Sequence, residues 1–530
     1  MSDLKGNMMD FKVLDNGKIT LKETLRNGIA SLVMVLPTLI QYFLYGVTFY
    51  AVSFICMLFC VFAFISYFRI NLKLFSPLMA ISFYNAVLMI SFGRIFGQFD
   101  YLAMINANAG EIKTFLTVNY GKVFTVVFIT FLFGAYLHYF IWSDNGLKWI
   151  KSSITFQRKA ILLIFIISVL PFVCVKQQVL LSTYPFACMS DLIITYKFES
   201  QASSYSNLQY MFSGNKPSTD ERSTFVIVIG ESARRDAFGF NAPYSCYATS
   251  PNLDRMVKDY PENFAIFRNY ISTGQSTVPT VLTMFNHSGT EDIMHCFEKP
   301  NLIKILSGAG YDVTIVKNQN SSFSGEYLEV SGKSSVIHGN IADREMISAF
   351  DKVSNSKGNV IVLHTIGSHV SRCGLGTENY LKSILETDIF LKELFEKILS
   401  SKNPVCAWYV SDHGENLDTG DVHGSGNITL GELEIPSIVV ANDAFKNAFS
   451  EKWANLNRHG KCLLTHNNFS QTVMGLINVF PTEYYNGRRD ISSDIFTEEK
   501  NPLLIPNNMI PIRYKSIFGK NRQRLVAGTR

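Results

Sequence analysis

Five long apolar stretches in the first third of the chain constrain its fold more than any other feature. They lie at about residues 28–44, 47–68, 74–93, 121–142 and 160–176. Each is close to the ~17–25 residues that a helix needs to cross a bilayer, and the charged fraction of the whole chain, 17%, is low for a soluble enzyme. The number and regularity of the stretches argue against the buried helices of a soluble protein. The sequence therefore predicts a five-helix transmembrane domain over residues 28–176.

The distribution of basic residues predicts how this domain is oriented. Lys and Arg occur in the polar segment 1–27 and in the second and fourth connections between the apolar stretches, which all fall on one side of the membrane. The positive-inside rule makes that side cytoplasmic. Segment 1–27 is too long and too mixed for the start of a cleaved signal peptide. We therefore expect a cytoplasmic N-terminal segment over 1–27, a linker over 177–222, and a domain over 223–530 on the outer side of the membrane.

Cysteine positions agree with an outer location for the second domain. Six of the nine cysteines lie beyond the predicted spans, where disulfides persist. Cys246 and Cys296 fall in polar loops and are the predicted disulfide pair. Cys406 lies in an apolar run and is expected to be a buried free thiol. Six cysteines allow 15 connectivities, so the spacing leaves the remaining pairs open.

From residue 223 onward, short apolar runs alternate with helical segments. The runs lie at residues 225–230, 312–317, 359–365, 406–412 and 435–442, and the helical segments include residues 300–310 and 379–399. This alternation predicts parallel strands in a doubly wound α/β sheet that binds ligands at the carboxyl ends of its strands. The net charge of +5 is spread along the chain and gives no case for nucleic acid binding.

Polar side chains gather where three of these predicted strands end. The first run is followed by Glu231 and the third by His369, and the fourth ends in Asp412 and is followed by His413, Glu415 and His423. Nitrogen and oxygen ligands without a thiolate suit Zn²⁺, with Mn²⁺ as the competitor. A single Asp-His pair in a loop is most often structural, but polar groups at successive strand ends of one sheet predict a metal site.

A hydroxyl-rich turn, "STGQST" at 272–277, supplies a candidate nucleophile. Thr277 precedes a helix-like run, so its hydroxyl would meet free N–H groups and the positive end of the helix dipole, a site that favours a phosphoryl group. A metal ion on that hydroxyl would lower its pKa. Ser276 and Thr280 are the alternatives. An N-cap role for Thr277 requires the same geometry and is compatible with catalysis.

Five further residues have competing interpretations. His364 lies inside the third predicted strand and fits the core as well as the site. His466 is interpreted as a helix-start residue outside the site. For Arg234 and Arg235 we favour structural pairing over substrate contact. Ser232 raises the alternative of a serine hydrolase, because "GESAR" half matches G-x-S-x-G, although Arg234 replaces the final glycine.

Taken together, these features resemble the phosphoethanolamine transferases. The resemblance rests on the five N-terminal spans, "GESARRDAFG", the Thr-bearing turn before Pro279, "LHTIGSH", and "VSDHGE" followed by "HG". It covers nearly the whole chain and implies a multi-pass bacterial inner-membrane protein with a periplasmic catalytic domain of the alkaline phosphatase/sulfatase-like fold. It also implies that phosphoethanolamine passes from phosphatidylethanolamine to a threonine, with release of diacylglycerol, and then to a periplasmic acceptor. A monomer is expected.

The resemblance assigns roles to individual residues. It implies a zinc ion held by Glu231, Thr277, Asp412 and His413, with Thr277 as the nucleophile. The family's further phosphate or second-metal positions, and hence a choice between one zinc ion and two, fall on His369, Glu415 and His423. Asn320 matches a position near the phosphate. Glu111, in the loop at 94–120, matches an acidic family position, whose partner is either Asn106 or Asn108.

Departures from the family pattern leave the acceptor open between lipid A or a core sugar of lipopolysaccharide and a periplasmic glucan. Ser324 stands where better-known members have a lysine, and Pro279 is two residues nearer the threonine. A phosphoglycerol transferase of the lipoteichoic acid type remains the alternative, since it shares the threonine chemistry. A sulfatase would need a Cys/Ser-x-Pro-x-Arg arrangement, which is absent near 272–283.

Overall fold

A computed structural model of the chain describes residues 28–29, 32, 116, 120–137, 196, 200–202, 204–247, 249–319, 327–328, 333–334, 342–353, 357–374, 376–417, 423, 428–506 and 511–518. Glu111, Asn320 and Cys188 lie outside these residues, as do four of the five predicted spans apart from residues 28, 29 and 32. The chain divides into two compact units, Met1–Phe96 with Tyr120–Leu192, and Gly97–Asn119 with Ile193–Arg530.

In the first unit, helix α6 (Tyr120–Leu137) occupies most of the fourth predicted span. Among the residues that the structure describes, no helix combines the length and apolar character needed to cross a membrane.

The second unit is built on a seven-stranded sheet with the order β3-β9-β8-β2-β7-β5-β6. Its strands are β2 (Thr224–Gly230), β3 (Phe264–Ile266), β5 (Asp312–Lys317), β6 (Lys333–Ser334), β7 (Asn359–His364), β8 (Val405–Ser411) and β9 (Ser437–Ala441). All five predicted runs form strands of this sheet. The central strand β2 is completely buried, which explains why its sequence is apolar at every position rather than at alternate ones.

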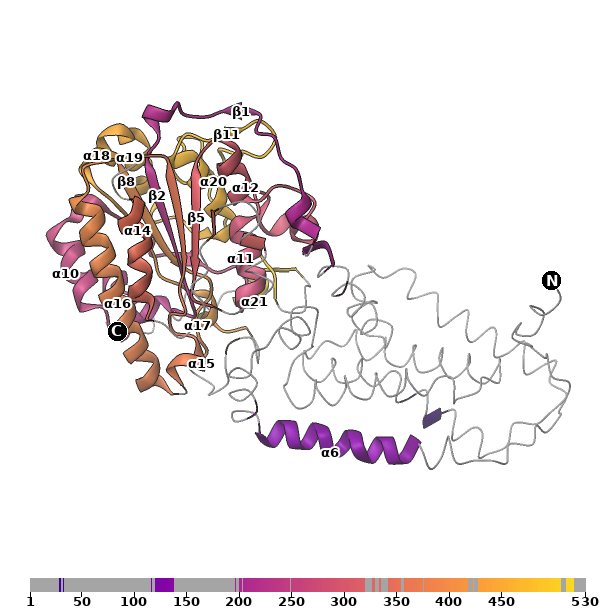
Figure 1. The fold of residues 1–530 in the computed structure, drawn as a ribbon. Coiled ribbons are helices and arrows are strands. Elements are labelled where there is room, and N and C mark those ends of the chain that lie inside the picture. Colours follow the sequence, from indigo (N-terminus) through magenta and orange to yellow (C-terminus); the bar gives the residue numbers. More distant parts are fainter. Residues whose placement is uncertain are drawn as a thin grey trace, which may run out of the picture. The chain divides into compact units, whose positions relative to one another are not determined.

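Helices cover both faces of the sheet, as Figure 1 shows. One face carries α10 (Pro251–Asp259), α14 (Ile347–Val353) and α16 (Thr377–Ser400), and the other α11 (Thr277–Phe285), α12 (Leu302–Gly308), α19 (Ser450–His459) and α20 (Phe469–Leu476). Alternate residues of β2 serve the two cores: Phe225 and Ile227 pack toward α11 and α12, and Val226 and Val228 toward α16. The structure also describes the short α-helices α15 (Val370–Cys373), α17 (Leu430–Leu433), α18 (Asp443–Ala448) and α21 (Tyr514–Phe518) in this unit.

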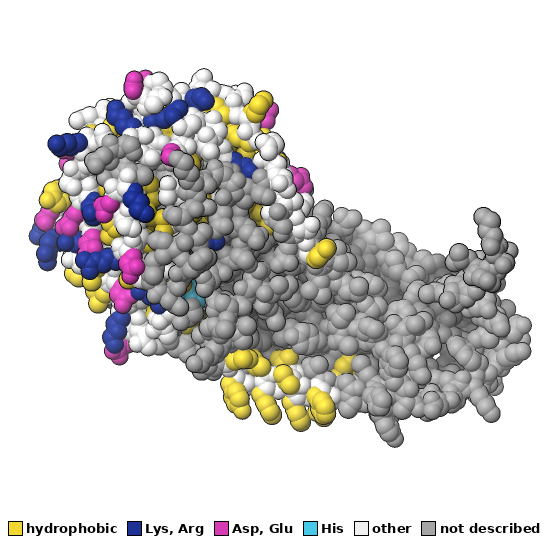
Figure 2. Space-filling model, viewed as in Figure 1, with side chains coloured by type: hydrophobic (Ala, Val, Ile, Leu, Met, Phe, Trp, Pro, Cys, Tyr) yellow, Lys and Arg dark blue, Asp and Glu magenta, His cyan; other side chains and the backbone are white. Residues whose placement is uncertain are grey.

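The outer surface of the α16 face carries many charged side chains. Figure 2 shows acidic and basic side chains interspersed over this part of the second unit. They form ion pairs such as Lys382–Glu378 at 2.7 Å along α16 and Arg372–Glu386 at 2.8 Å. Such exposed pairs add little stability individually, but they keep this face soluble while its inner side packs on the sheet.

Strand direction departs from the prediction at β9. β2 is parallel to β7 and β8, and β7 is parallel to β5, as expected, whereas β9 runs antiparallel to β8 and β3 antiparallel to β9. The expectation of a parallel strand at 435–442 is therefore wrong. An apolar run reports burial on both faces of a strand and carries no information about its direction. The ends of β2, β5, β7 and β8 still meet at one edge, where the predicted site residues lie.

The end of the predicted linker packs on the second unit. β1 (Gly214–Asn215) pairs antiparallel with β11 (Phe480–Pro481), and Tyr205, which is 1% exposed, belongs to the core on the α12 side of the sheet. The two short strands β4 (Tyr270–Ile271) and β10 (Leu464–Thr465) form a separate parallel pair, and β12 (Leu503–Leu504) and β13 (Ile512–Arg513) an antiparallel one. The β4–β10 pair leads directly into the "STGQST" turn.

The predicted disulfide is not formed. Cys246 is exposed and free, whereas Cys296 is buried and free. Cys296 lies in the hydrophobic core with Phe297 and Tyr205, so its thiol faces apolar side chains rather than the surface loop that holds Cys246. Cys406 is a buried free thiol, as predicted.

Candidate active site

Glu231 lies at the end of β2, in a turn that burial and backbone contacts hold tightly. Its side chain is 0% exposed. Ser232 has a left-handed φ of 56°, a conformation that costs a serine free energy and is typical of functional turns. Ser232 Oγ donates to Glu231 Oε1 at 2.7 Å. Gly367, with φ of 45°, packs so closely that a Cβ there would lie 2.8 Å from the Glu231 carbonyl oxygen, which explains the glycine of "HTIGSH".

Asp412 and His413 follow β8, the strand next to β2. Both side chains are 0% exposed. The His413 N–H donates to Asp412 Oδ1 at 2.7 Å. His413 Nδ1 donates to the Gly414 carbonyl at 2.8 Å, which leaves Nε2 as the ring nitrogen that faces the two carboxylates. That nitrogen lies 3.3 Å from Glu231 Oε1 and 3.4 Å from Asp412 Oδ2.

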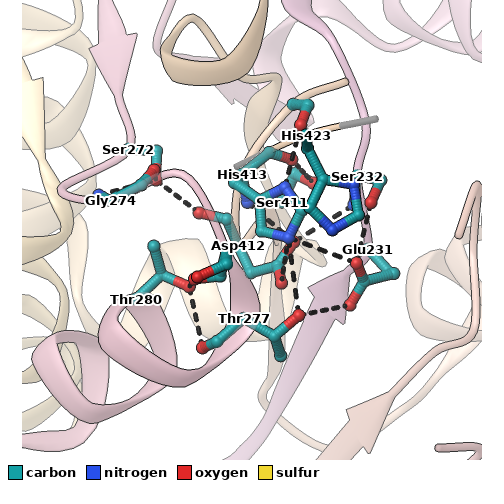
Figure 3. A network of polar contacts seen from close by, with 12 residues as sticks. Glu231, Ser232, Ser272, Gly274, Thr277, Thr280, Ser411, Asp412, His413 and His423 are labelled. Atoms are coloured by element: carbon teal, nitrogen blue, oxygen red, sulfur yellow. Dashed lines mark hydrogen bonds and ion pairs between the residues drawn. The ribbon is translucent and has the colours of Figure 1, made fainter. Parts of the chain in front are cut away.

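Thr277 lies at the helix start, as the sequence predicts, but it is the first residue of α11 and Ser276 is the N-cap, so the N-cap interpretation of Thr277 is wrong. Its Oγ1 donates to Glu231 Oε2 at 3.1 Å and lies 3.4 Å from His413 Nε2. Figure 3 shows these three side chains and Asp412 pointing toward one another. Thr277 is half-buried, whereas the alternative Thr280 is 0% exposed and donates to the carbonyls of Ser276 and Thr277. The geometry favours Thr277 over Thr280 as the reacting hydroxyl.

The group formed by Glu231, Asp412 and His413 fits a cation. Their ligand atoms lie within 4.8 Å of one another. Asp412 Oδ2 is buried without a hydrogen-bond partner, and a buried carboxylate oxygen is costly unless a charge or donor meets it. Two carboxylates, one imidazole nitrogen and a nearby hydroxyl form an N/O donor set of the kind that zinc accepts.

The pKa values of these groups show the same need for positive charge. Burial raises the pKa of Asp412, as does the neighbouring Glu231, to about 7. Burial acts against ionisation of Glu231 too, but the hydrogen bond and charge of His413 outweigh it and hold the pKa of Glu231 well below its usual value. Burial lowers the pKa of His413, yet Asp412 and Glu231 raise it to about 10. Two adjacent carboxylates therefore require a proton or a cation between them.

His369 and His423 lie beside this group, with Glu415 behind them. His369, His423 and Glu231 bring ligand atoms within 4.8 Å of one another. The ring centroids of His413 and His423 are 4.3 Å apart. Glu415 accepts from the His423 N–H at 2.6 Å and lies 2.9 Å from its Nδ1. Glu415 is buried and contacts His423, so its position suits orienting that imidazole more than direct substrate contact.

The charges of this second group favour a protonated imidazole. Burial lowers the pKa of His423, but the Glu415 carboxylate raises it above its usual value. Burial by itself would raise the pKa of Glu415, but the charge of His423 and its hydrogen bond lower this pKa below its usual value. His369, His423 and Thr277 are the half-buried members of the site, so they mark its open side.

Hydroxyl groups join the loops that carry these residues. Ser411 Oγ accepts from the Ala233 N–H at 2.9 Å and donates to the His413 carbonyl at 2.8 Å. Ser272 Oγ lies 2.6 Å from the Asp412 carbonyl oxygen and 2.8 Å from that of Gly274. Figure 3 shows Ser272 and Ser411 on either side of Asp412. These contacts tie the Glu231 turn and the Thr277 turn to the end of β8.

Residues 432–434, the C-terminal end of α17 and its C-cap residue, hold three site loops through their backbone. The carbonyls of Glu432, Leu433 and Glu434 accept from the N–H groups of Gly414, Ser272 and Arg235, respectively, at 2.7, 2.7 and 2.9 Å. No sequence pattern predicts a role for this segment in the site. These three contacts are made by main-chain carbonyls, which every residue type supplies.

His466 and Asp343 also stabilise the site loops through hydrogen bonds. The sequence did not predict this role for either residue. His466 begins a short 3-10 helix, His466–Asn468, as its helix-start interpretation requires, and it is also 0% exposed beside the site. Its Nε2 is 3.1 Å from the Ser411 carbonyl oxygen and its Nδ1 3.4 Å from the Thr273 N. Asp343 accepts from the Ile366 and Gly367 N–H groups, both at 3.0 Å. The signal that could have found Asp343 is an acidic residue in the polar stretch before a helix.

Arg234 and Arg235 are both engaged in structural pairs. Arg234 makes two bonds to Asp236, at 3.0 and 2.7 Å. Arg235 pairs with Glu434 and lies 4.3 Å from the ring centroid of Tyr244. Both are 6% exposed. Their geometry agrees with the structural interpretation.

The remaining competing interpretations concern His364 and Ser232. His364 is 1% exposed at the end of β7, and burial lowers its pKa to about 4, so it is a neutral core histidine. Ser232 is 0% exposed, and its hydroxyl is occupied by Glu231. A nucleophile must reach its substrate, so this burial argues against a serine hydrolase.

The chain is similar to several known proteins. Residues 223–479 match the sulfatase family. The phosphoethanolamine transferase OpgE of Escherichia coli is 26% identical over 220 residues, and the phosphoethanolamine transferase EptA of Salmonella typhimurium is 23% identical over 319 residues. The structure of the integral membrane protein lipooligosaccharide phosphoethanolamine transferase A from Neisseria meningitidis matches 88% of this chain and 97% of its own, with a TM-score of 0.61 and 20% identity.

These similarities relate the chain to the phosphoethanolamine transferase family. The matched regions make up 36% and 51% of this chain and only 39% and 56% of OpgE and EptA, so the chain spans about half or less of these curated relatives. The periplasmic domain of EptC from Escherichia coli in complex with zinc has the same fold, with a TM-score of 0.51 and 18% identity over 58% of this chain and 98% of that one. The alkaline phosphatase/sulfatase-like fold expected for this family is that of the second unit.

Proposed function

We propose that this chain transfers phosphoethanolamine from phosphatidylethanolamine to a lipid or glycan acceptor of the bacterial envelope. The observation that carries the proposal is the half-buried Thr277 hydroxyl, which lies at the start of α11 within hydrogen-bonding distance of Glu231 and His413. The relatives named above are phosphoethanolamine transferases, and their shared chemistry supports the same group for this chain.

A zinc ion would be held by Glu231, Asp412, His413 and Thr277. When bound, it would lower the pKa of the Thr277 hydroxyl and offset charge on the phosphate. The described donor set fits zinc, and Mn²⁺ would compete for its oxygen-rich part.

The residues of this chain divide the remaining work. Thr277 Oγ1 attacks phosphorus, an O–P bond to Thr277 forms, and the O–P bond to diacylglycerol breaks. The Thr277 proton, which points to Glu231 Oε2, ends on the diacylglycerol hydroxyl. His423, whose pKa Glu415 raises, and His369 lie on the open side, where positive charge favours phosphoryl oxygens. An acceptor hydroxyl then displaces Thr277 and restores its proton.

Localisation follows from the same proposal. We place the first unit in the bacterial inner membrane as a multi-pass anchor and the second unit in the periplasm. The basic residues of segment 1–27 and of the second and fourth connections support this orientation. The partners would be phosphatidylethanolamine as the donor and either lipopolysaccharide or a periplasmic glucan as the acceptor. The enzyme would act as a monomer.

The test uses the purified full-length chain in detergent with phosphatidylethanolamine labelled in its headgroup. We expect zinc-dependent release of diacylglycerol and a phosphoethanolamine adduct on the peptide that contains Thr277. Thr277→Ala should reduce turnover by at least about 1,000-fold with the fold intact, whereas Ser276→Ala should have a small effect.

Other results would redirect the proposal. Label retained by Thr277→Ala would move the nucleophile to another hydroxyl. Transfer from phosphatidylglycerol in place of phosphatidylethanolamine would favour the phosphoglycerol transferase alternative. Mass spectrometry of envelope lipids and glycans from cells with and without the gene would then identify the acceptor.

A further inference from the structure

A buried amide outside the predicted site residues contacts the Glu231 carboxylate. Gln319 follows β5 and is 7% exposed. Its Nε2 donates to Glu231 Oε2 at 2.6 Å and to the Thr365 carbonyl at 2.9 Å. Both hydrogens of the amide group are thus used, one on the carboxylate and one on the backbone after β7.

The anchor of Gln319 belongs to the sheet itself. The Thr365 N–H donates to the Ile229 carbonyl at 3.0 Å, and Thr365 Oγ1 donates to the same oxygen at 2.9 Å. The amide of Gln319 is therefore held by the residue that follows the carboxyl end of β7, and this residue is hydrogen-bonded to β2. A donor anchored in this way can determine where the carboxylate of Glu231 lies.

The contacts of Glu231 divide between its two oxygens. Oε1 accepts from Ser232 Oγ at 2.7 Å and lies 3.3 Å from His413 Nε2. Oε2 accepts from Gln319 at 2.6 Å and from Thr277 Oγ1 at 3.1 Å. The terminal torsion of a glutamate side chain is broad, so the donors on each oxygen select its orientation. Without Gln319, the reactive Thr277 hydroxyl would be the remaining protein donor to Oε2 among these contacts.

We propose that Gln319 is a positioning residue, which holds the Glu231 carboxylate in the orientation that a metal ion and Thr277 require. This inference rests on the proposed function, in which Glu231 is a metal ligand. Residues that hydrogen-bond to metal ligands commonly change metal affinity by about 10- to 100-fold when they are removed. A neutral amide suits this role because it donates without altering the charge of the site.

The test is zinc affinity of the purified full-length chain, measured with Zn²⁺ alone by competition with a chromophoric chelator. Gln319→Met keeps the length of the side chain and removes the donor, so we expect zinc to bind about 10- to 100-fold more weakly. The matched control is Gln471→Met. Gln471 is 1% exposed and its Nε2 also donates twice, to the His287 and Tyr484 carbonyls. It lies outside the site, and its variant should bind zinc like the wild type.

Each other outcome overturns a distinct statement. If the wild type binds zinc and Gln319→Met binds it equally well, the positioning role is wrong while the metal site stands. If the wild type binds no zinc, the assignment of Glu231 as a metal ligand is wrong, and the positioning role of Gln319 is wrong as well. Should Gln319→Met not fold, Gln319→Asn replaces it: the shorter amide cannot span both acceptors, and wild-type affinity in that variant would equally overturn the proposal.

Discussion

At the scale of single residues, the sequence and the structure agree best where a motif combines chemistry with a strand end. Glu231, Asp412 and His413 each follow a buried apolar run, so both their residue type and their place at one edge of the sheet are readable from sequence. Their partners are not. Ser272 meets Asp412, and Gln319 meets Glu231, across 140 and 88 residues of chain. Serine and glutamine have no pattern of their own, and only the fold brings such distant residues together.

His466 shows how a correct local interpretation can miss a tertiary role. A histidine at a helix start satisfies the local pattern, yet its ring also joins the end of β8 to the Thr277 turn. Because the Ser411 carbonyl can only accept, Nε2 of His466 carries the hydrogen, and Nδ1 can then accept from the Thr273 N–H. This arrangement requires a neutral imidazole, and burial lowers the pKa of His466 to about 3.

We expect His466 to make the second unit sensitive to acid. Since its folded pKa is below the unfolded value of about 6.5, its stability contribution is fully present above pH ~6.5 and is lost as the pH falls toward the folded pKa. At pH ~4.5 the loss is about 3 kcal/mol. Thermal unfolding with chelator present should show a smaller drop in this range for His466→Gln, whose amide does not titrate. Equal drops in the two proteins would contradict this assignment.

At the scale of elements, apolar runs locate strands well and orient them poorly. All five predicted runs are strands, because a strand buried on both faces must be apolar at successive positions. β9 reverses direction with no change in its composition. Among the described residues between β8 and β9, the helix is the short α17, and carbonyls of residues 432–434 hold the site loops through main-chain groups that residue identity cannot reveal.

The glycine of the Asp-His-Gly motif has a physical reason at this scale. A Cβ on Gly414 would lie 2.0 Å from the Gly431 carbonyl oxygen, a backbone atom on the α17 segment. The Gly414 N–H also donates to the Glu432 carbonyl at 2.7 Å. The turn that carries Asp412 and His413 therefore packs against α17 with no room for a side chain.

Gly414→Ala should accordingly displace this turn. We expect a loss of at least about 2 kcal/mol in the free energy of unfolding, together with weaker zinc binding, measured by thermal unfolding and metal analysis. Gly487→Ala is the matched control, since a Cβ there would meet the flexible end of the Ile495 side chain at 3.0 Å. If Gly414→Ala were as stable as the control, the close packing against α17 would not constrain the motif.

At the scale of the whole molecule, the sequence predicts an organisation that rests on hydropathy and charge. The expected domain boundary is residue 223, whereas the second compact unit consists of Ile193–Arg530 together with Gly97–Asn119. Composition locates a polar connector, but it cannot show that Tyr205 packs into the catalytic core. The disulfide prediction failed for a similar reason, because spacing does not reveal that Cys296 faces the interior.

The free cysteines provide a test of orientation. Cys246 is exposed, while Cys296 and Cys406 are buried, and burial raises the pKa values of both buried thiols well above their usual range. Since the thiolate is the reactive form, Cys246 should react with a maleimide much faster than the other two. If the second unit is periplasmic, a membrane-impermeant maleimide added to intact spheroplasts should label Cys246.

The comparison that isolates this residue is wild type against Cys246→Ser. We expect rapid labelling of the wild type, a clear loss of that fast fraction in the variant, and no gain when the inner membrane is permeabilised. Cys373 and Cys462 are partly buried and would contribute a slower fraction that is common to both proteins. Fast labelling that appears only after permeabilisation would place the second unit in the cytoplasm. That result would reverse the orientation that the basic residues predict and remove phosphatidylethanolamine of the outer leaflet as the donor.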